Sequence, residues 1–185
     1  MGTTDDAAAS LHDLAAHYRQ HPVTGAAGHS YIAAGPRATR TVPAAPLDLD
    51  MIDHIDASVR EIADHARQVN PDADPLPARV KDAYGWYMET TALAPVAEQQ
   101  RRDTIVYRQH LEHAIRLGDI KIVRPHRCPK CRTLGLMWDR VQRTVVCTNG
   151  NCLTRDGLTR KFTLAQLAYE HVAAQYENSV RDCAT

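Results

Sequence analysis

Apolar residues recur at intervals of three and four along much of the chain, a pattern typical of helices with one buried face. The clearest case is 48–70, where the apolar stripe extends over about three heptads. Shorter stripes predict helices over 6–20, 78–91 and 96–117. The residues of the four stripes are, in chain order, Leu11, Leu14 and Tyr18; Ile52, Ile55, Val59, Ile62, Ala66 and Val69; Val80, Tyr84, Tyr87 and Met88; and Ile105, Val106, Leu111, Ile115 and Leu117.

Helix-ending signals divide the first two thirds of the chain. Asn70-Pro71 ends the 48–70 helix, and Gly118 is placed to cap the helix over 96–117. Residues 21–46 are rich in Gly and Pro and show no periodicity, which predicts a flexible linker. We therefore expect an N-terminal helix within 1–20, a linker over 21–46 and a small helical bundle over 47–119.

Short apolar runs dominate the last third of the chain. Ile120, Ile122 and Val123 predict a short strand, and Leu134–Trp138 and Thr144–Cys147 predict a β-hairpin. A terminal helix is expected to begin at Thr163, because Thr163 and Gln166 have the spacing of a capping box. The fold class predicted is therefore mainly α, a helical bundle followed by a hairpin unit and a terminal helix over 120–178.

Four cysteines lie on the two flanks of the predicted hairpin, as Cys128-Pro-Lys-Cys131 and as Cys147 and Cys152. Two close pairs at this spacing are typical of a tetrahedral metal site, so we expect one structural Zn²⁺ and a zinc ribbon. Four sulfur ligands leave no position for water, which argues against catalytic zinc. An iron–sulfur cluster, a redox role for the first pair, and His126 as a competing ligand remain open.

The net charge of the chain is zero, but its distribution is uneven. Residues 47–74 carry eight acids and two bases, a net charge of −6, whereas 121–161 carry ten bases and two acids, a net charge of +8. Basic residues gathered around a metal module favour contact with nucleic-acid phosphates, and Trp138 is available for stacking. The alternative is a solvated face that balances the acidic helix. The predicted contact residues are Arg124, Arg127, Lys130, Arg132, Arg140, Arg143, Arg155, Arg160 and Lys161.

No catalytic constellation is found in the sequence. The zincin pattern, the phosphate-binding glycine loop, the dinucleotide fingerprint and the serine-hydrolase elbow are all absent. We therefore expect no enzyme. We also expect no signal peptide, because no N-terminal segment has an apolar core of sufficient length, and no apolar run approaches the ~20 residues that a membrane span needs. A cytoplasmic location is the expectation, in which paired cysteines bind metal rather than form disulfides.

The stretch from Cys128 to His171 resembles the zinc-ribbon ends of small proteins from actinobacterial phages and integrated mobile elements. The shared features are the two cysteine pairs, the Leu136-Met137-Trp138 strand and the Arg-Lys-Phe-Thr-Leu lead into the last helix. The start of the 48–70 helix, PLDLDMIDHID, is similar as well. The resemblance implies a zinc-bearing accessory or regulatory protein and implies no enzymatic activity.

Two functions follow as expectations. In the first, the chain is a nucleic-acid-binding or regulatory factor of a phage or mobile element, whose basic ribbon contacts DNA or RNA. The 48–70 helix then packs within the bundle, forms a homodimer or binds a protein partner. In the second, the chain is a protein–protein adaptor or structural component in which zinc only stabilises the fold. Salt-dependent binding to DNA distinguishes the two.

Overall fold

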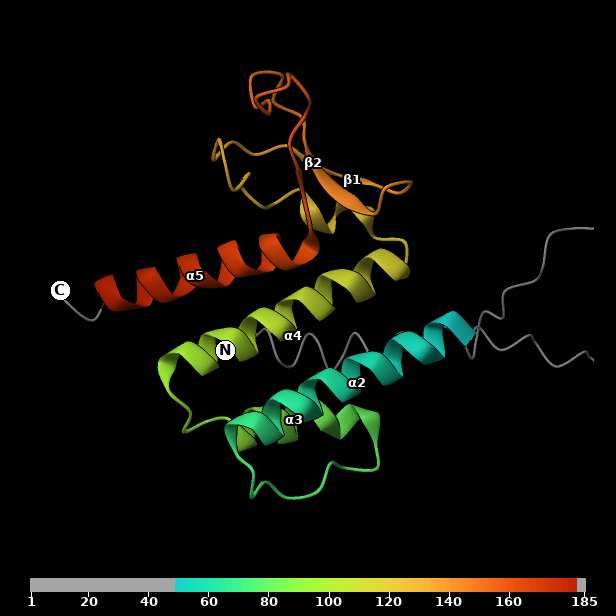
Figure 1. Cartoon of the computed structure of the whole chain (residues 1–185), viewed down its shortest axis with the longest axis vertical. Helices are drawn as coiled ribbons and strands as arrows, with labels where there is room; N and C mark the ends of the chain where they lie inside the picture. Colours follow the sequence, from blue (N-terminus) through green and yellow to red (C-terminus); the bar gives the residue numbers. More distant parts are fainter. Residues whose placement is uncertain (1–48, 183–185) are drawn as a thin grey trace, which may run out of the picture.

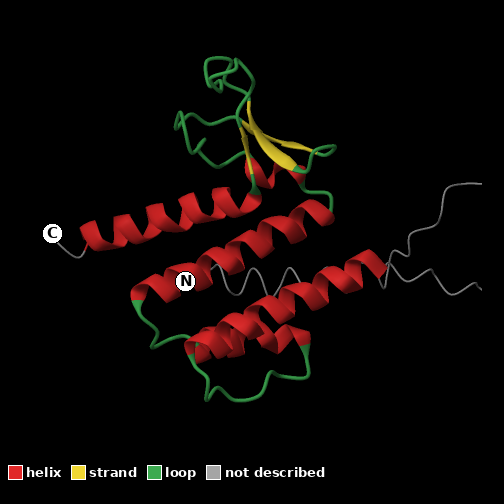
Figure 2. Ribbon diagram, viewed as in Figure 1, coloured by secondary structure: helices red, strands yellow, loops and turns green. Residues whose placement is uncertain are grey.

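The computed structural model describes residues 49–182, and these form four helices, one short 3-10 helix and one small sheet (Figures 1 and 2). The elements are α2 (Leu49–Val69), α3 (Val80–Thr90), α4 (Val96–Arg116), η1 (Ile120–Val123), β1 (Leu136–Asp139), β2 (Thr144–Cys147), β3 (Lys161–Phe162) and α5 (Leu164–Asp182). The predicted mainly helical fold is confirmed for this part of the chain. The helix expected over 6–20 and the linker expected over 21–46 lie outside the described residues.

A first apolar core joins α2, α3 and α4. Its largest members are Tyr84 and Tyr87 of α3, both completely buried, which pack with Ile62 of α2 and Val106 of α4. The apolar stripe of α2 is thus covered by helices of the same chain, while Ile52 at its margin is 38% exposed. Val80 does not face inward as expected: it lies at the first position of α3 and is exposed.

A second apolar core lies between the C-terminal half of α4, the sheet and the start of α5. Leu111 of α4, Leu136 of β1, Val145 of β2 and Leu167 of α5 meet there, all buried. Helix α4 therefore contributes its N-terminal half to the first core and its C-terminal half to the second. Figure 1 shows α2, α4 and α5 side by side, in the order α2, α4, α5. The sheet lies above the C-terminal end of α4 and the N-terminal end of α5.

The strand predicted at 120–123 is wrong, because these residues form the 3-10 helix η1. The side chain of Asp119 accepts a hydrogen bond from the Lys121 amide at 3.0 Å, which caps this turn. The chain has just left α4 at Gly118, where φ is +92°, as the predicted C-terminal cap requires. Val123 is completely buried by this turn, so its apolar character reflects packing and not strand pairing.

The predicted hairpin forms, with Leu136 opposite Cys147 and Asp139 opposite Thr144. A third strand, β3, was not predicted: Phe162 pairs with Val145 on the free edge of β2. The strand order is β1-β2-β3, and all pairs are antiparallel. β3 is only two residues long and leads directly into α5, so its sequence carried no alternation from which to predict it.

Helix α5 begins where the sequence predicts. The Thr163 side chain accepts from the Gln166 amide at 3.1 Å, and the Gln166 side chain accepts from the Thr163 amide at 2.9 Å, which completes the capping box. The helix packs along α4, and Tyr176 donates a hydrogen bond to Asp103 of α4 at 2.7 Å. Within residues 49–182, no helix is both long and apolar enough to cross a membrane.

Candidate metal centre

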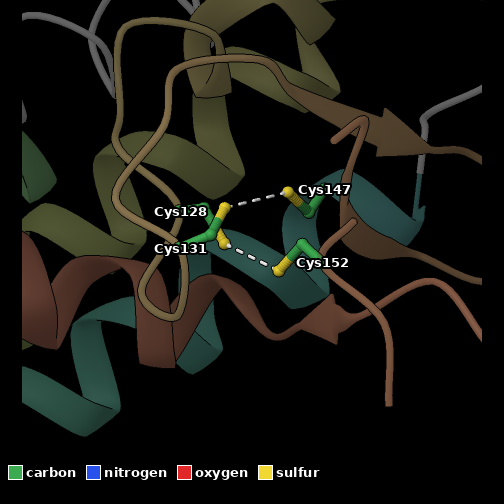
Figure 3. A group of neighbouring side chains, drawn as sticks. All are labelled: Cys128, Cys131, Cys147 and Cys152. Atoms are coloured by element: carbon green, nitrogen blue, oxygen red, sulfur yellow. Dashed lines mark hydrogen bonds between the residues drawn. The ribbon is translucent and has the colours of Figure 1, made fainter. Parts of the chain in front are cut away.

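The four predicted ligand cysteines come together in the structure. Their sulfur atoms all lie within 4.8 Å of one another, with Cys128 Sγ 3.8 Å from Cys152 Sγ and Cys131 Sγ 3.7 Å from Cys147 Sγ. Figure 3 shows the side chains pointing toward a common centre from two loops. These separations are well beyond the ~2.05 Å of a disulfide bond. The cluster can therefore hold one metal ion.

Local backbone turns explain how each loop presents two sulfurs to the centre. In the first loop the Arg132 amide bonds to the Cys128 carbonyl at 2.9 Å, and Arg132 takes a left-handed conformation with φ 59°. The Cys128 amide bonds in turn to the Thr133 carbonyl at 2.9 Å. This closed turn directs the Cys128 and Cys131 side chains the same way.

The second loop starts from the end of β2. Cys147 is the last residue of this strand, and the Cys152 amide bonds to the Asn149 carbonyl at 2.9 Å. The Arg160 backbone joins the ends of the loop, because its carbonyl accepts from Cys147 at 3.1 Å and its amide bonds to Cys152 at 3.4 Å. The sheet and the turn together fix the second pair of sulfurs relative to the first.

The four cysteines are part of the second apolar core and do not form a separate unit outside it. Cys128 is completely buried, Cys147 and Cys152 are nearly so, and Leu136 and Leu167 belong to the same apolar cluster. Cys131 is half-buried at the outer side. The position of the β-sheet relative to α4 and α5 therefore depends on the same contacts that bring the sulfurs together.

The electrostatics of the cluster call for a cation. Burial raises the pKa of Cys152 to about 12, with hydrogen bonds to the other cysteines acting in the same direction, and burial also raises the pKa of Cys147. Hydrogen bonds from Thr133 instead lower the pKa of Cys131 to about 6. Four thiolates this close repel one another, so all four ionise together only around a positive ion.

His126 does not compete as a ligand. Its Nε2 atom lies 2.7 Å from the Tyr107 hydroxyl and its Nδ1 atom lies 3.3 Å from the Val123 carbonyl, so both ring nitrogens have protein partners. Within the described part of the chain, the cysteines are the one group of three or more potential ligand side chains close enough to share an ion. No role was predicted for Thr133, whose hydroxyl lies 2.9 Å from Cys131 Sγ. Its position two residues after a predicted ligand could have indicated this contact.

The nine predicted contact residues are exposed, apart from the half-buried Arg160. They are spread over the end of η1, the first cysteine loop, the turn between β1 and β2, the loop after Cys152 and β3. Arg140 and Arg143 are at the turn that follows β1, remote in register from the Leu136–Cys147 pair at the metal end. Arg127 and Arg132 lie at the metal end, where Arg132 forms an ion pair with Glu170 of α5 at 3.4 Å. Their role in binding nucleic acid stays a prediction.

No family model, curated protein or solved structure matches this chain. The resemblance of 128–171 to phage and mobile-element proteins thus stays a prediction that rests on the residues quoted for it.

Proposed function

We propose that the four cysteines bind one structural Zn²⁺. A regular tetrahedron with Zn–S bonds of about 2.3 Å has sulfur–sulfur edges of about 3.8 Å. The distances between Cys128 and Cys152 and between Cys131 and Cys147, 3.8 and 3.7 Å, agree with this edge. A cluster of several irons separates its four thiolates further, because they bind different metal atoms. A centre with four cysteine ligands has no open position, which argues for a structural role.

We further propose that the chain is a non-enzymatic nucleic-acid-binding factor, of the accessory or regulatory kind found in phages and mobile elements. The observation that carries this proposal is the exposed positive charge of residues 121–161, most of which is not neutralised by ion pairs. Among residues 49–182, no ion pair joins the acids of α2 to the bases of 121–161, and Arg132 is the one predicted contact residue in an ion pair. Unpaired guanidinium and ammonium groups on a rigid module favour phosphate binding.

One observation favours the adaptor function instead. Several large apolar side chains are exposed within residues 121–161, the segment that contains the four cysteines and that we call the metal module. Exposed apolar residues that form a contiguous patch are typical of a surface that binds protein. They are Leu134 (60% exposed), Met137 (48%), Val141 (93%), Leu153 (40%) and Leu158 (66%).

The proposals are tested first by composition and then by binding. Elemental analysis of the purified chain is expected to give one zinc per chain. Fluorescence anisotropy with labelled DNA and RNA is expected to show binding at ~50 mM salt that weakens steeply toward ~200 mM, as phosphate contacts require.

A charge reversal at the hairpin turn tests whether this turn is part of the nucleic-acid-binding surface. The double variant Arg140→Glu with Arg143→Glu is expected to abolish binding, while Arg60→Glu with Arg67→Glu on α2 makes the same charge change outside the basic module and retains it. Arg60, Arg67, Arg140 and Arg143 are all exposed, so the pairs are matched. Absence of any binding at ~50 mM salt would contradict the nucleic-acid proposal and favour the adaptor.

A further inference from the structure

A cleft of about 660 Å³ lies between the helical bundle and the hairpin turn. Its walls come from α2, the C-terminal half of α4, β1 with the turn that follows it, and the first turn of α5. In Figure 1 the hairpin projects over the C-terminal end of α4, and the N-terminal end of α2 lies on the other side of α4. The lining residues used below are His54, Glu112, Arg116, Trp138, Arg140 and Arg143.

The cleft is positively charged. Arg108 also lines it but is neutralised by ion pairs to Glu61 and Glu112. Arg116, Arg140 and Arg143 form no ion pair with any residue in 49–182. Three arginines from α4 and the hairpin turn thus face one cavity that contains a single, already paired carboxylate, Glu112.

The charges of arginines in the cleft also act on the imidazole of His54. Burial is the main cause that lowers the pKa of His54 to about 4, and the charges of Arg116, Arg108 and Arg143 lower it further. The side chain is therefore neutral at pH 7. An anion in the cleft would offset these charges and raise the pKa of His54.

One wall of the cleft is aromatic. Trp138 of β1 is half-buried: it packs against the second core and also lines the cavity. Indole rings stack on nucleic-acid bases, and such contacts tolerate every base because each has a π-face. The cavity thus pairs a stacking surface with a set of cations.

The hairpin turn places Arg143 at the cleft in a left-handed conformation. Asp139 Oδ1 accepts from the amides of Val141 and Gln142 at 2.9 and 3.1 Å, which tightens the turn. The turn then ends at Arg143 with φ 51°, a left-handed conformation that suits Gly and strains other residues.

We propose that this cleft binds one nucleotide unit, with its phosphate on Arg116, Arg140 and Arg143 and its base stacked on Trp138. The inference deepens the proposed nucleic-acid function and rests on it. A cleft of this volume suits a ligand of about one nucleotide, and stacking on a side chain requires an unpaired base. The ligand is therefore a unit of a single strand or a free mononucleotide, which share this chemistry.

Trp138 fluorescence provides the direct test. The full-length, zinc-loaded chain carries Trp86→Phe, so that Trp138 is the sole indole. Titration with AMP and with a 12-nucleotide single-stranded DNA is expected to quench this emission, whereas inorganic phosphate, which has no base, is expected to leave it unchanged. The His54 proton resonances are expected to shift in the same titrations. Equal affinity for AMP and the strand identifies a free nucleotide as the ligand, and tighter binding of the strand identifies nucleic acid.

Two glycine variants make a matched pair. Arg143→Gly and Arg132→Gly each remove one arginine from a left-handed position of the metal module, but only Arg143 lines the cleft. Arg143→Gly is expected to weaken AMP binding by at least about tenfold, as loss of a charged hydrogen bond does. Arg132→Gly is expected to leave AMP affinity unchanged. Trp138→Leu keeps apolar packing and is expected to weaken binding about 5-fold or more. Because this variant lacks the indole reporter, its binding is followed by the His54 proton resonances.

The outcomes separate the two proposals. If the strand binds but AMP causes no quenching, and the two glycine variants affect the strand equally, the cleft proposal is overturned while the nucleic-acid function stands. If neither DNA nor RNA binds the wild-type chain at low salt and AMP causes no quenching, both are overturned.

Discussion

His54 Nε2 lies 2.9 Å from His113 Nδ1, and this contact joins the second turn of α2 to the last turn of α4. The two rings meet edge to face, with centroids 4.8 Å apart. His54 lines the basic cleft, whereas His113 is completely buried and its Nε2 atom has no hydrogen-bond partner in the described part of the chain. The pair therefore links the cleft to the interior of the bundle.

Acid is expected to destabilise the fold through His113. Burial is the main cause that lowers the pKa of His113 to about 3, from an ordinary value of 6.5. Between these values the unfolded chain binds the proton and the folded chain does not. The free energy of unfolding therefore falls as pH falls below 6.5, by up to about 1.4 kcal/mol per pH unit. Urea unfolding of the zinc-loaded chain at several pH values between 6.5 and 4.5 measures this slope.

His113→Gln supplies the control, because it keeps a hydrogen-bonding side chain but does not titrate. Acid also protonates the cysteines and releases zinc, and this contribution is common to both proteins. The variant is expected to show a shallower slope by about one proton. Identical slopes would contradict the assignment of the acid sensitivity to His113.

Removal of the proposed zinc ion is expected to unfold one core and spare the other. The cysteines belong to the cluster around Leu136 and Leu167, whereas Tyr84 and Tyr87 belong to the cluster of α2, α3 and α4. A strong zinc chelator is expected to abolish hydrogen-exchange protection in β1 and β2 and to reduce it in α5. Amides of α2 and α3 are expected to stay protected, and chelator already saturated with zinc is expected to change nothing. Uniform loss of protection along the chain would show that the two cores fold as one unit.

Gly135 is expected to tolerate no side chain. Its φ is +116°, and an added Cβ would lie 2.7 Å from Thr148 Oγ1, which itself donates to the Gly135 carbonyl at 2.5 Å. Gly157→Ala is the control, because φ there is +75° but the surrounding space is open. We expect a cost of about 1–2 kcal/mol for Gly157→Ala from the backbone alone and a larger cost for Gly135→Ala. Thermal unfolding gives both values.

A second substitution tests the cause. Thr148→Ala removes the hydroxyl oxygen that the new methyl group would meet, so it is expected to recover part of the stability that Gly135→Ala loses. Equal costs for the two glycine variants, or no recovery, would contradict the steric explanation.

The helices could be predicted because their signals are local. The apolar spacing over 48–70 and 96–117 gave α2 and α4 to within a residue or two at each end, and both hydrogen bonds of the Thr163–Gln166 capping box form. The strand predicted over Ile120–Val123 does not form, because β-branched residues favour strands only where a partner strand is present. Here the chain turns at Asp119 and buries Val123 against the second core instead.

The metal site and the cleft differ in how far their residues are separated. The cysteine ligands come in two close pairs that flank one hairpin, so spacing and ligand chemistry were sufficient to predict that they meet. The cleft combines His54, Arg116 and Arg143 from three elements. No periodicity relates these positions, and only the packing of the hairpin over α4 brings them together.

Arg143→Gly is expected to stabilise the chain while it weakens nucleotide binding. A left-handed arginine costs about 1–2 kcal/mol relative to right-handed backbone, and glycine relieves this strain but loses about 0.5–1 kcal/mol of conformational entropy on folding. The net gain expected is about 0.5–1 kcal/mol. Arg132→Gly gains less, because it also removes the exposed ion pair to Glu170, worth about 0–1 kcal/mol. Urea unfolding of the zinc-loaded, ligand-free variants measures both, and a loss of stability in Arg143→Gly would show that the Arg143 side chain stabilises the turn instead of straining it.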